Sequence, residues 1–205
     1  MKAEIAGFVN ETLQIIALED YSAQIFLMES GDAKLDWQVA VDMLYRCVRS
    51  ELVSLHPYGE GLANLSREAY FKQMSKSDPS TGSVESWDIA KVWVGTYVIG
   101  TVKCVELLAS HGLLNQEAAL MLAKGLRQHA ITSPGAYPDR NFETAEDAIA
   151  RAHVLEECIE ISSRRASSGL AVQERNCRLS RELEQIFESY GVPVTDVALF
   201  PVCSA

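Results

Sequence analysis

The sequence predicts a mainly α-helical fold, built as a multi-helix bundle. Along several segments, apolar residues recur at intervals of three or four positions, which is the period of an α-helix. Capping residues precede some of these segments and glycines follow them, as at helix ends. Hydrophobic residues make up 48% and charged residues 22% of the 205 positions, which is ordinary for a globular protein with a sizeable core. We expect one helical domain over 1–205, with a division into 1–111 and 112–205 as the alternative.

The N-terminal part is predicted to form two helices. Residues 4–17 carry an apolar face at helical spacing, made of Ile5, Val9, Leu13 and Ile16. Glu19 and Asp20 suit the first turn of a second helix, where the helix dipole favours negative charge. Glycine favours the backbone conformation that ends helices, so this helix is expected to end at Gly31. Its apolar residues are Tyr21, Ile25, Phe26 and Met28.

A helix over Leu35–Leu55 is predicted to organise the whole fold. Its polar residues form a thin stripe, and almost every other position is apolar. A helix with so wide an apolar surface is normally packed by neighbours on several sides. Leu44 and Val48 are therefore expected at the centre of the core, and Asp42 is spaced to form an ion pair with Arg46. The stripe consists of Gln38, Asp42, Arg46, Arg49 and Ser50.

The middle of the chain contains one ambiguous segment. Before it, residues 56–61 break the helical pattern, Ser66 is placed to cap a short helix, and residues 75–86 form a polar loop. Residues 87–111 then fit two patterns: alternation over roughly 90–100 favours a strand, and a helical face runs through the same residues. Gly95 and Gly100 weaken the helix by about 1 kcal/mol each relative to alanine. We predict one helix, continuous or broken, with a short β segment near 90–101 as the alternative.

The second half of the chain has clearer helix signals. Gly112 ends the preceding element, and Asn115 caps a helix that runs to about residue 129. After a loop over 132–141, Thr144 and Asp147 form a capping box for another helix. Residues 167–169 form a turn, and the final helix carries a heptad-like seam before Gly191 and Pro193 end it. The apolar tail, 192–202, is expected to lie on the body as a short strand. The seam consists of Val172, Asn176, Leu179, Leu183, Ile186 and Tyr190.

Acidic residues are concentrated near the N-terminus. The net charge of the chain is −10, and residues 1–45 carry eight carboxylates against two lysines, a local charge of −6. Binding to a phosphate backbone needs clustered Lys and Arg, so we expect no nucleic-acid partner. The acids at helix ends and turns are candidates for contact with a basic protein, and Asp20 and Asp36 are the ones best placed to act as helix caps instead. These candidates are Glu19, Asp20, Glu29, Asp32 and Asp36. The alternative is a solvated surface that maintains solubility.

No pattern of catalytic or metal-binding residues is recognisable in the sequence. His153, Glu156, Glu157 and Glu160 cluster on one predicted helix, but position 150 is alanine, so the spacing of a di-iron bundle fails. Nucleophile and phosphate-loop motifs are missing. We therefore expect no enzyme activity, no cofactor and no metal.

The cysteines and the apolar runs indicate an intracellular protein. The five cysteines are odd in number and widely spaced, which argues against a disulfide framework and predicts free thiols. Acidic residues interrupt the N-terminus too early for a signal peptide, and the apolar run over 92–102 is too short to span a membrane. We expect a cytoplasmic protein without membrane contact.

One family resemblance covers residues 19–111. Glu19-Asp20-Tyr21, Asp36-Trp37, Leu44-Tyr45-Arg46 and Leu52-Val53-Ser54-Leu55, followed by Asp78-Pro79, Trp87 and Gly100-Thr101, resemble small bacterial immunity proteins of polymorphic or contact-dependent toxin systems. The resemblance implies a cytoplasmic inhibitor that binds a toxin domain stoichiometrically and has no activity of its own. The same stretch also resembles a winged-helix arrangement, which would imply a transcriptional regulator. A helical enzyme with an unrecognised site is the third hypothesis.

Overall fold

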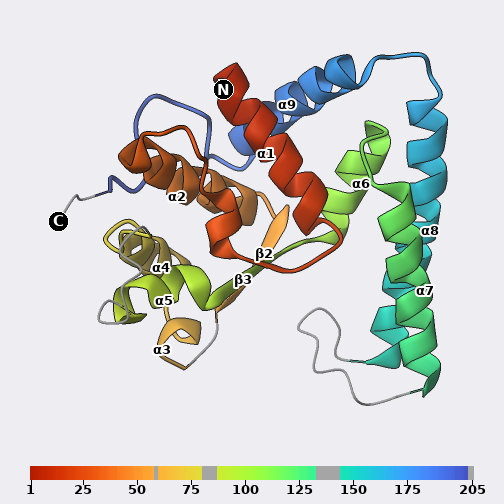
Figure 1. Cartoon of the computed structure of the whole chain (residues 1–205), viewed down its shortest axis with the longest axis horizontal. Coiled ribbons are helices and arrows are strands. Elements are labelled where there is room, and N and C mark those ends of the chain that lie inside the picture. Colours follow the sequence, from red (N-terminus) through yellow and green to blue (C-terminus); the bar gives the residue numbers. More distant parts are fainter. Residues whose placement is uncertain (58–59, 80–86, 133–143, 203–205) are drawn as a thin grey trace. The chain divides into compact units, whose positions relative to one another are not determined.

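The computed structural model describes residues 1–57, 60–79, 87–132 and 144–202, and most of them are helical (Figure 1). This confirms the predicted mainly α-helical class. In these ranges, three strands form one small antiparallel sheet. The predicted loop at 75–86 lies partly outside the described residues, and nearly all of the predicted loop at 132–141 does.

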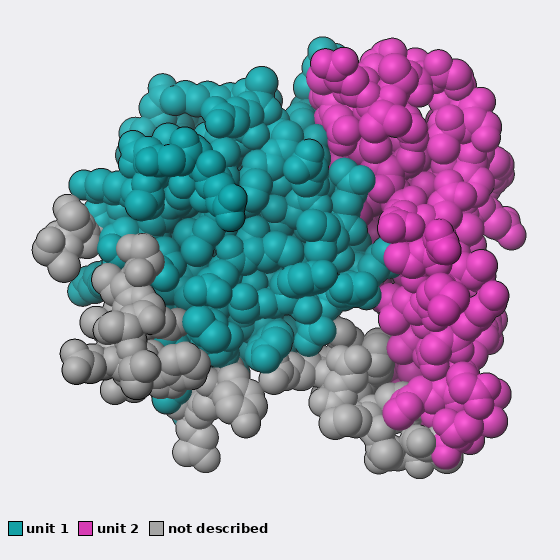
Figure 2. Space-filling view, in the orientation of Figure 1, with its two compact units in different colours: residues 1–100, 180–205 teal, residues 101–179 magenta. Residues whose placement is uncertain are grey.

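The chain divides into two compact units (Figure 2). Unit 1 comprises residues 1–100 and 180–205, and unit 2 comprises residues 101–179. Each unit is described by itself below. None of the helices in the described ranges is long and apolar enough to cross a lipid bilayer.

Two long helices form the core of unit 1. Helix α1 (Ala3–Ile16) confirms the first predicted helix and buries Val9, Leu13 and Ile16. Helix α2 (Ala33–Arg49) is the predicted central helix, and most of its residues are buried. Leu44 is 0% exposed and Val48 is also buried, so both predicted core positions are confirmed.

The sheet of unit 1 has the strand order β1-β3-β2. Strand β2 (Val53–Pro57) pairs antiparallel with β3 (Thr96–Gly100), with Val53 opposite Gly100 and Pro57 opposite Thr96. The short strand β1 (Tyr21–Ser22) pairs with the other edge of β3, with Tyr21 opposite Val98. Strand β3 packs closely against the end of α1. The contact at Gly100 leaves no room for a side chain, since a Cβ atom added there would lie 2.7 Å from the Cα atom of Ala17.

The predicted second helix is wrong. Its residues form strand β1 and the 3₁₀ helix η1 (Ala23–Phe26) instead. A short isolated helix is marginal in water, and here the backbone of Tyr21 and Ser22 pairs with β3. The turn of η1 also buries Ala23 and Phe26 completely. Pairing with a distant strand therefore outweighs the local helical pattern.

The central helix is shorter than predicted, because it ends at Arg49 rather than reaching Leu55. Glu51 has a φ of 63°, a left-handed conformation that costs a non-glycine residue about 1–2 kcal/mol. Beyond it, the residues predicted as the last helical turn form β2. Pairing with β3 again decides the structure, and the alternating pattern of this short segment suits a strand.

The ambiguous segment 87–111 contains both predicted structures. Helix α5 (Trp87–Val94) is followed by β3 and then by α6 (Val102–Ser110), so the helix is broken and the short β segment near 90–101 is present. Thr101 caps α6, since its hydroxyl accepts a hydrogen bond from the Cys104 amide at 3.4 Å. The winged-helix arrangement stays a prediction.

Short helices complete the first part of unit 1. Helix α3 (Glu60–Ala63) precedes α4 (Arg67–Met74), and the Ser66 hydroxyl caps α4 as predicted. The buried Tyr70 hydroxyl donates to the Val92 carbonyl at 2.9 Å, and Trp93 Nε1 donates to the Ser77 carbonyl at 2.6 Å. These bonds join α4 and its C-terminal turn to α5.

Unit 2 is built on α6, α7 (Gln116–Thr132) and α8 (Ala145–Ala166). Helices α7 and α8 pack side by side, and α6 also packs on α8. The predicted caps are confirmed: Asn115 accepts from the Ala118 amide at 3.2 Å, and Thr144 and Asp147 form the reciprocal capping box. Gly112 has a φ of 67° after α6, as expected for a residue that ends a helix.

The last helix, α9 (Val172–Ser189), confirms only part of the predicted seam. Leu179 and Leu183 of the seam are fully buried, but Val172 is 57% exposed, and Asn176, Ile186 and Tyr190 are only half-buried. Phe187, which the predicted seam did not include, is fully buried next to Ile186. Gly191, with a φ of 72°, follows the helix as predicted. The tail after it lies on the body of unit 1 through hydrogen bonds, as predicted. It forms no strand over residues 192–202, so the predicted short strand is wrong.

Candidate functional site

Four of the five predicted partner-contact residues are exposed. Glu19 and Asp20 lie in the turn between α1 and β1, and Glu29 and Asp32 lie between η1 and α2. Asp36, in contrast, is only 7% exposed. All five belong to unit 1.

Asp32 and Asp36 stabilise the start of α2. The Asp32 carboxylate is the helix cap, because its Oδ1 accepts from the Lys34 and Leu35 amides at 3.1 and 3.0 Å. Asp36 accepts from the Ser30 amide at 3.0 Å and from the Ser30 hydroxyl at 2.6 Å. The cap is thus Asp32 rather than Asp20 or Asp36, and we leave the buried Asp36 out of the proposed contact surface.

Glu19 forms a local pair with Tyr21 at the edge of the sheet. The Tyr21 hydroxyl donates to Glu19 Oε2 at 2.9 Å. This hydrogen bond, together with the negative charge of Glu19, raises the pKa of Tyr21. We define the acidic surface as Glu19, Asp20, Glu29 and Asp32, the exposed members of the predicted set.

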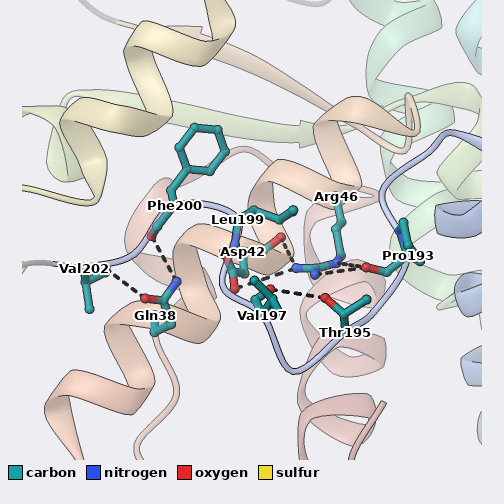
Figure 3. Close-up of polar contacts among 9 residues, drawn as sticks. All are labelled: Gln38, Asp42, Arg46, Pro193, Thr195, Val197, Leu199, Phe200 and Val202. Carbon is teal, nitrogen blue, oxygen red and sulfur yellow. Dashed lines mark hydrogen bonds and ion pairs between the residues drawn. The ribbon is translucent and has the colours of Figure 1, made fainter.

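The polar stripe of α2 holds the C-terminal tail (Figure 3). Gln38 Nε2 donates to the Phe200 carbonyl at 3.0 Å, and its Oε1 accepts from the Val202 amide at 2.9 Å. Asp42 Oδ1 accepts from the Leu199 amide at 3.1 Å. Because residues four apart lie on one side of a helix, Gln38, Asp42 and Arg46 face the tail together.

Arg46 holds the start of the tail. Its Nε and Nη2 atoms donate to the Pro193 carbonyl at 3.4 and 3.1 Å, and its Nη1 atom donates to the Asp42 carbonyl at 3.0 Å. The side chain is 1% exposed, which is rare for an arginine and is tolerated only when its N–H groups have partners. Arg46 therefore fixes the point where the tail leaves α9.

The predicted ion pair between Asp42 and Arg46 is loose. The closest side-chain atoms, Arg46 Nη1 and Asp42 Oδ2, are 3.9 Å apart. Burial raises the pKa of Asp42, although Arg46 and the tail amides oppose the change. Burial likewise lowers the pKa of Arg46 against the attraction of Asp42. Hydrogen bonds to the tail, rather than charge attraction alone, therefore account for these buried groups.

Phe200 anchors the tail in an aromatic cluster. Its ring centroid lies 4.9 Å from that of Tyr45 and 5.8 Å from that of Phe71. Tyr45 and Phe71 are themselves 5.0 Å apart in an edge-to-face arrangement, a geometry that aromatic pairs prefer. We define the tail site as Gln38, Asp42, Arg46, Tyr45 and Phe71.

A cavity of about 470 Å³ lies beside the tail site. Residues 194–196 of the tail form one wall. Met1, Lys2 and the first turn of α1 form another, and α2 with its polar stripe forms the third. Ile5, Val39 and Met43 supply apolar surface, so the lining is mixed. The tail thus shapes a cavity as well as covering α2.

Arg127, His153 and Glu156 join two helices of unit 2. Arg127 on α7 donates to both carboxylate oxygens of Glu156 on α8, at 2.9 and 2.7 Å, and its Nη2 lies 3.0 Å from His153 Nδ1. Such a bidentate pair between exposed side chains aligns the two helices and contributes little stability. In the described ranges, no group of three or more His, Cys, Asp or Glu side chains is arranged to hold a metal ion.

The described cysteines are free thiols, as predicted. Cys47, Cys104 and Cys158 are buried, and Cys177 is exposed. Burial raises the pKa of Cys104 to about 12, which keeps it protonated and unreactive at neutral pH. The three buried thiols therefore act as small apolar side chains.

No family model, curated protein or solved structure matches this chain. Its function is accordingly argued from the acidic surface and the tail site.

The sequence predictions missed the role of the tail. The polar stripe of α2 was identified, but its partners, from Pro193 to Val202, were not. One signal was present: Gln38, Asp42 and Arg46 repeat every four residues on a helix that is otherwise almost entirely apolar. An isolated polar row in such a helix indicates a buried polar partner, because unpaired polar groups are costly in a core.

Proposed function

We propose that this chain is an immunity protein, a cytoplasmic inhibitor that neutralises a bacterial toxin by stoichiometric binding. The acidic surface is its contact site, and its partner is a basic protein domain rather than a nucleic acid. The chain acts by binding and not by catalysis. The observation that carries the proposal is the exposure of Glu19, Asp20, Glu29 and Asp32 within a region of local charge −6.

Charge complementarity supports this choice of partner. A toxin that cleaves nucleic acid must attract phosphates, so its active-site surface is positive. An acidic inhibitor can cover such a surface, and long-range attraction accelerates the encounter. The four residues of the acidic surface are exposed, so their negative charge is accessible to a partner.

The local backbone supports the proposal as well. The pairing of β1 with β3 holds the chain directly after Glu19 and Asp20, and the Asp32 cap holds it directly after Glu29. A contact surface that is already ordered loses little conformational entropy on binding. Ala23 and Phe26, which lie between these acids in the sequence, are fully buried and anchor the segment in the core of unit 1.

Co-expression with a candidate toxin domain, sought in the reading frame next to the gene for this chain, tests the proposal. We expect the chain to restore growth of cells that produce that domain and to form a 1:1 complex with it in solution. The double variant Asp20→Lys and Glu29→Lys should slow association at low salt by about tenfold or more and flatten its salt dependence. Asp32 is left unchanged because its side chain caps α2.

A matched variant controls for net charge. Glu157→Lys with Glu160→Lys changes the total charge equally, on exposed positions of α8 outside the acidic surface. We expect this variant to associate nearly as fast as the unmodified chain. Equal association rates for the two double variants would show that the acidic surface serves only solubility. Failure of the unmodified chain to restore growth would refute the inhibitor role.

A further inference from the structure

The tail site recognises its occupant through the backbone as well as through a side chain. Gln38 contacts the Phe200 carbonyl and the Val202 amide, and Asp42 contacts the Leu199 amide. None of these three bonds uses a tail side chain. An extended peptide of another chain would offer the same carbonyl and amides, so the polar part of this recognition is not specific to the tail.

The proline between the two contacts of Gln38 explains the pattern. Pro201 has no amide hydrogen, so the segment leaves no donor without a partner between Phe200 and Val202. A residue that precedes proline is also restricted to extended backbone, which prepares Phe200 for this position. One glutamine side chain, with both a donor and an acceptor, therefore satisfies the backbone on both sides of a proline in an extended segment.

Specificity comes from the aromatic part of the site. The Phe200 ring packs against Tyr45 and against Phe71, which is fully buried. Aromatic contacts of this kind add to the free energy of burying the ring. In contrast, Val197 and Leu199 of the tail are exposed and contribute little side-chain contact.

We propose that the tail site is a peptide-binding site for an extended aromatic–proline–aliphatic segment, which residues 199–202 occupy in cis. The partner is a segment of another protein with the chemistry of Leu-Phe-Pro-Val. The tail competes with it from a high effective concentration, because only a short connection separates it from α9. The tail is thus autoinhibitory, and the site opens when the tail is displaced. This inference does not depend on the acidic surface or on an immunity function.

A peptide titration of the full chain tests the proposal. The probe is a synthetic peptide with the sequence of residues 197–202, added to ¹⁵N-labelled protein and followed by NMR. In the Phe200→Asp variant, whose own tail binds poorly, we expect saturable shifts of the α2 amides between Trp37 and Arg46. The unmodified chain should need about tenfold more peptide or more, because only a small fraction of its sites is open.

Two controls establish specificity. A peptide with aspartate in place of phenylalanine should bind neither protein. Adding Gln38→Ala to the Phe200→Asp variant should weaken binding, whereas Gln14→Ala, which removes a glutamine of α1 that donates to the Asn10 carbonyl of the same helix, should not. If Phe200→Asp does not fold by circular dichroism, Phe200→Ala replaces it and the same criteria apply.

Two results would overturn the proposal. The first is a folded variant at residue 200 whose α2 amides show no saturable shift when the peptide is added. A peptide-induced shift that Gln38→Ala leaves unchanged would count equally against the proposal. The second is a concentration-dependent dimer of the unmodified chain that the Phe200 variants abolish, since the site would then hold the tail of a second copy.

Discussion

Replacing Arg46 with alanine is expected to lower the free energy of unfolding by about 3–5 kcal/mol, the usual cost of removing one partner of a buried charged pair. The substitution removes both donors to the Pro193 carbonyl and leaves the buried Asp42 carboxylate without its partner Arg46. It also leaves a void, because the Arg46 side chain is 1% exposed. Urea denaturation followed by circular dichroism measures this loss.

Arg49→Ala is the matched control for this prediction. Arg49 lies on the same helix but is exposed, so its removal should change stability by no more than about 0.5 kcal/mol. Combining Arg46→Met with Asp42→Asn should cost less than Arg46→Ala alone, because no charge then stays buried. If Arg46→Ala and Arg49→Ala have equal effects, Arg46 does not hold the tail.

Leu44→Ala is expected to cost about 2–5 kcal/mol, the range for a fully buried leucine. Leu44 is 0% exposed and lies midway along α2, where the neighbouring side chains cannot easily close the void. Thermal or urea denaturation measures the change. An unaltered midpoint would show that α2 is not the central element of unit 1.

Leu35→Ala tests whether the effect comes from burial rather than from the residue type. Leu35 lies in the first turn of α2 and is 46% exposed. Its truncation removes the same atoms without opening a cavity, so we expect a loss of about 0.5 kcal/mol or less. A loss as large as that of Leu44→Ala would contradict the assigned core.

Features with local causes could be predicted from the sequence. The caps at Ser66, Asn115 and Thr144 each depend on one side chain and an amide a few residues away. The apolar spacing of α1 and α2 likewise depends on the helical period alone. Such signals lie within a few residues of one another, so the fold class followed from them.

The wrong predictions in unit 1 share one non-local cause. Tyr21–Ser22 and Val53–Pro57 both become strands because β3, far along the chain, offers them hydrogen-bonding partners. Strand formation depends strongly on such context, so the local helical pattern of these segments was misleading. Their structure could be assigned only once β3 itself was placed.

The acidic surface and the tail site show the same difference between features with local causes and features with non-local causes. The exposure of Glu19, Asp20 and Glu29 followed from their charge and their position in turns. The burial of Asp36 could not be predicted from its charge or position, because it depends on hydrogen bonds from Ser30 at the start of the helix. The tail contacts span more than 140 residues of sequence, from Arg46 to Pro193, and no local pattern reports them.

The most direct test of this account is native-state hydrogen exchange at the Leu199 and Val202 amides, since both the stability and the peptide-site predictions require that α2 holds the tail. We predict that both amides exchange at least about tenfold more slowly than in a free peptide of the same sequence, because each is hydrogen-bonded in the folded state. Gln38→Ala should remove the protection of Val202 and leave much of that of Leu199, which bonds to Asp42. Exchange of both amides at the free-peptide rate in the unmodified protein would contradict the account.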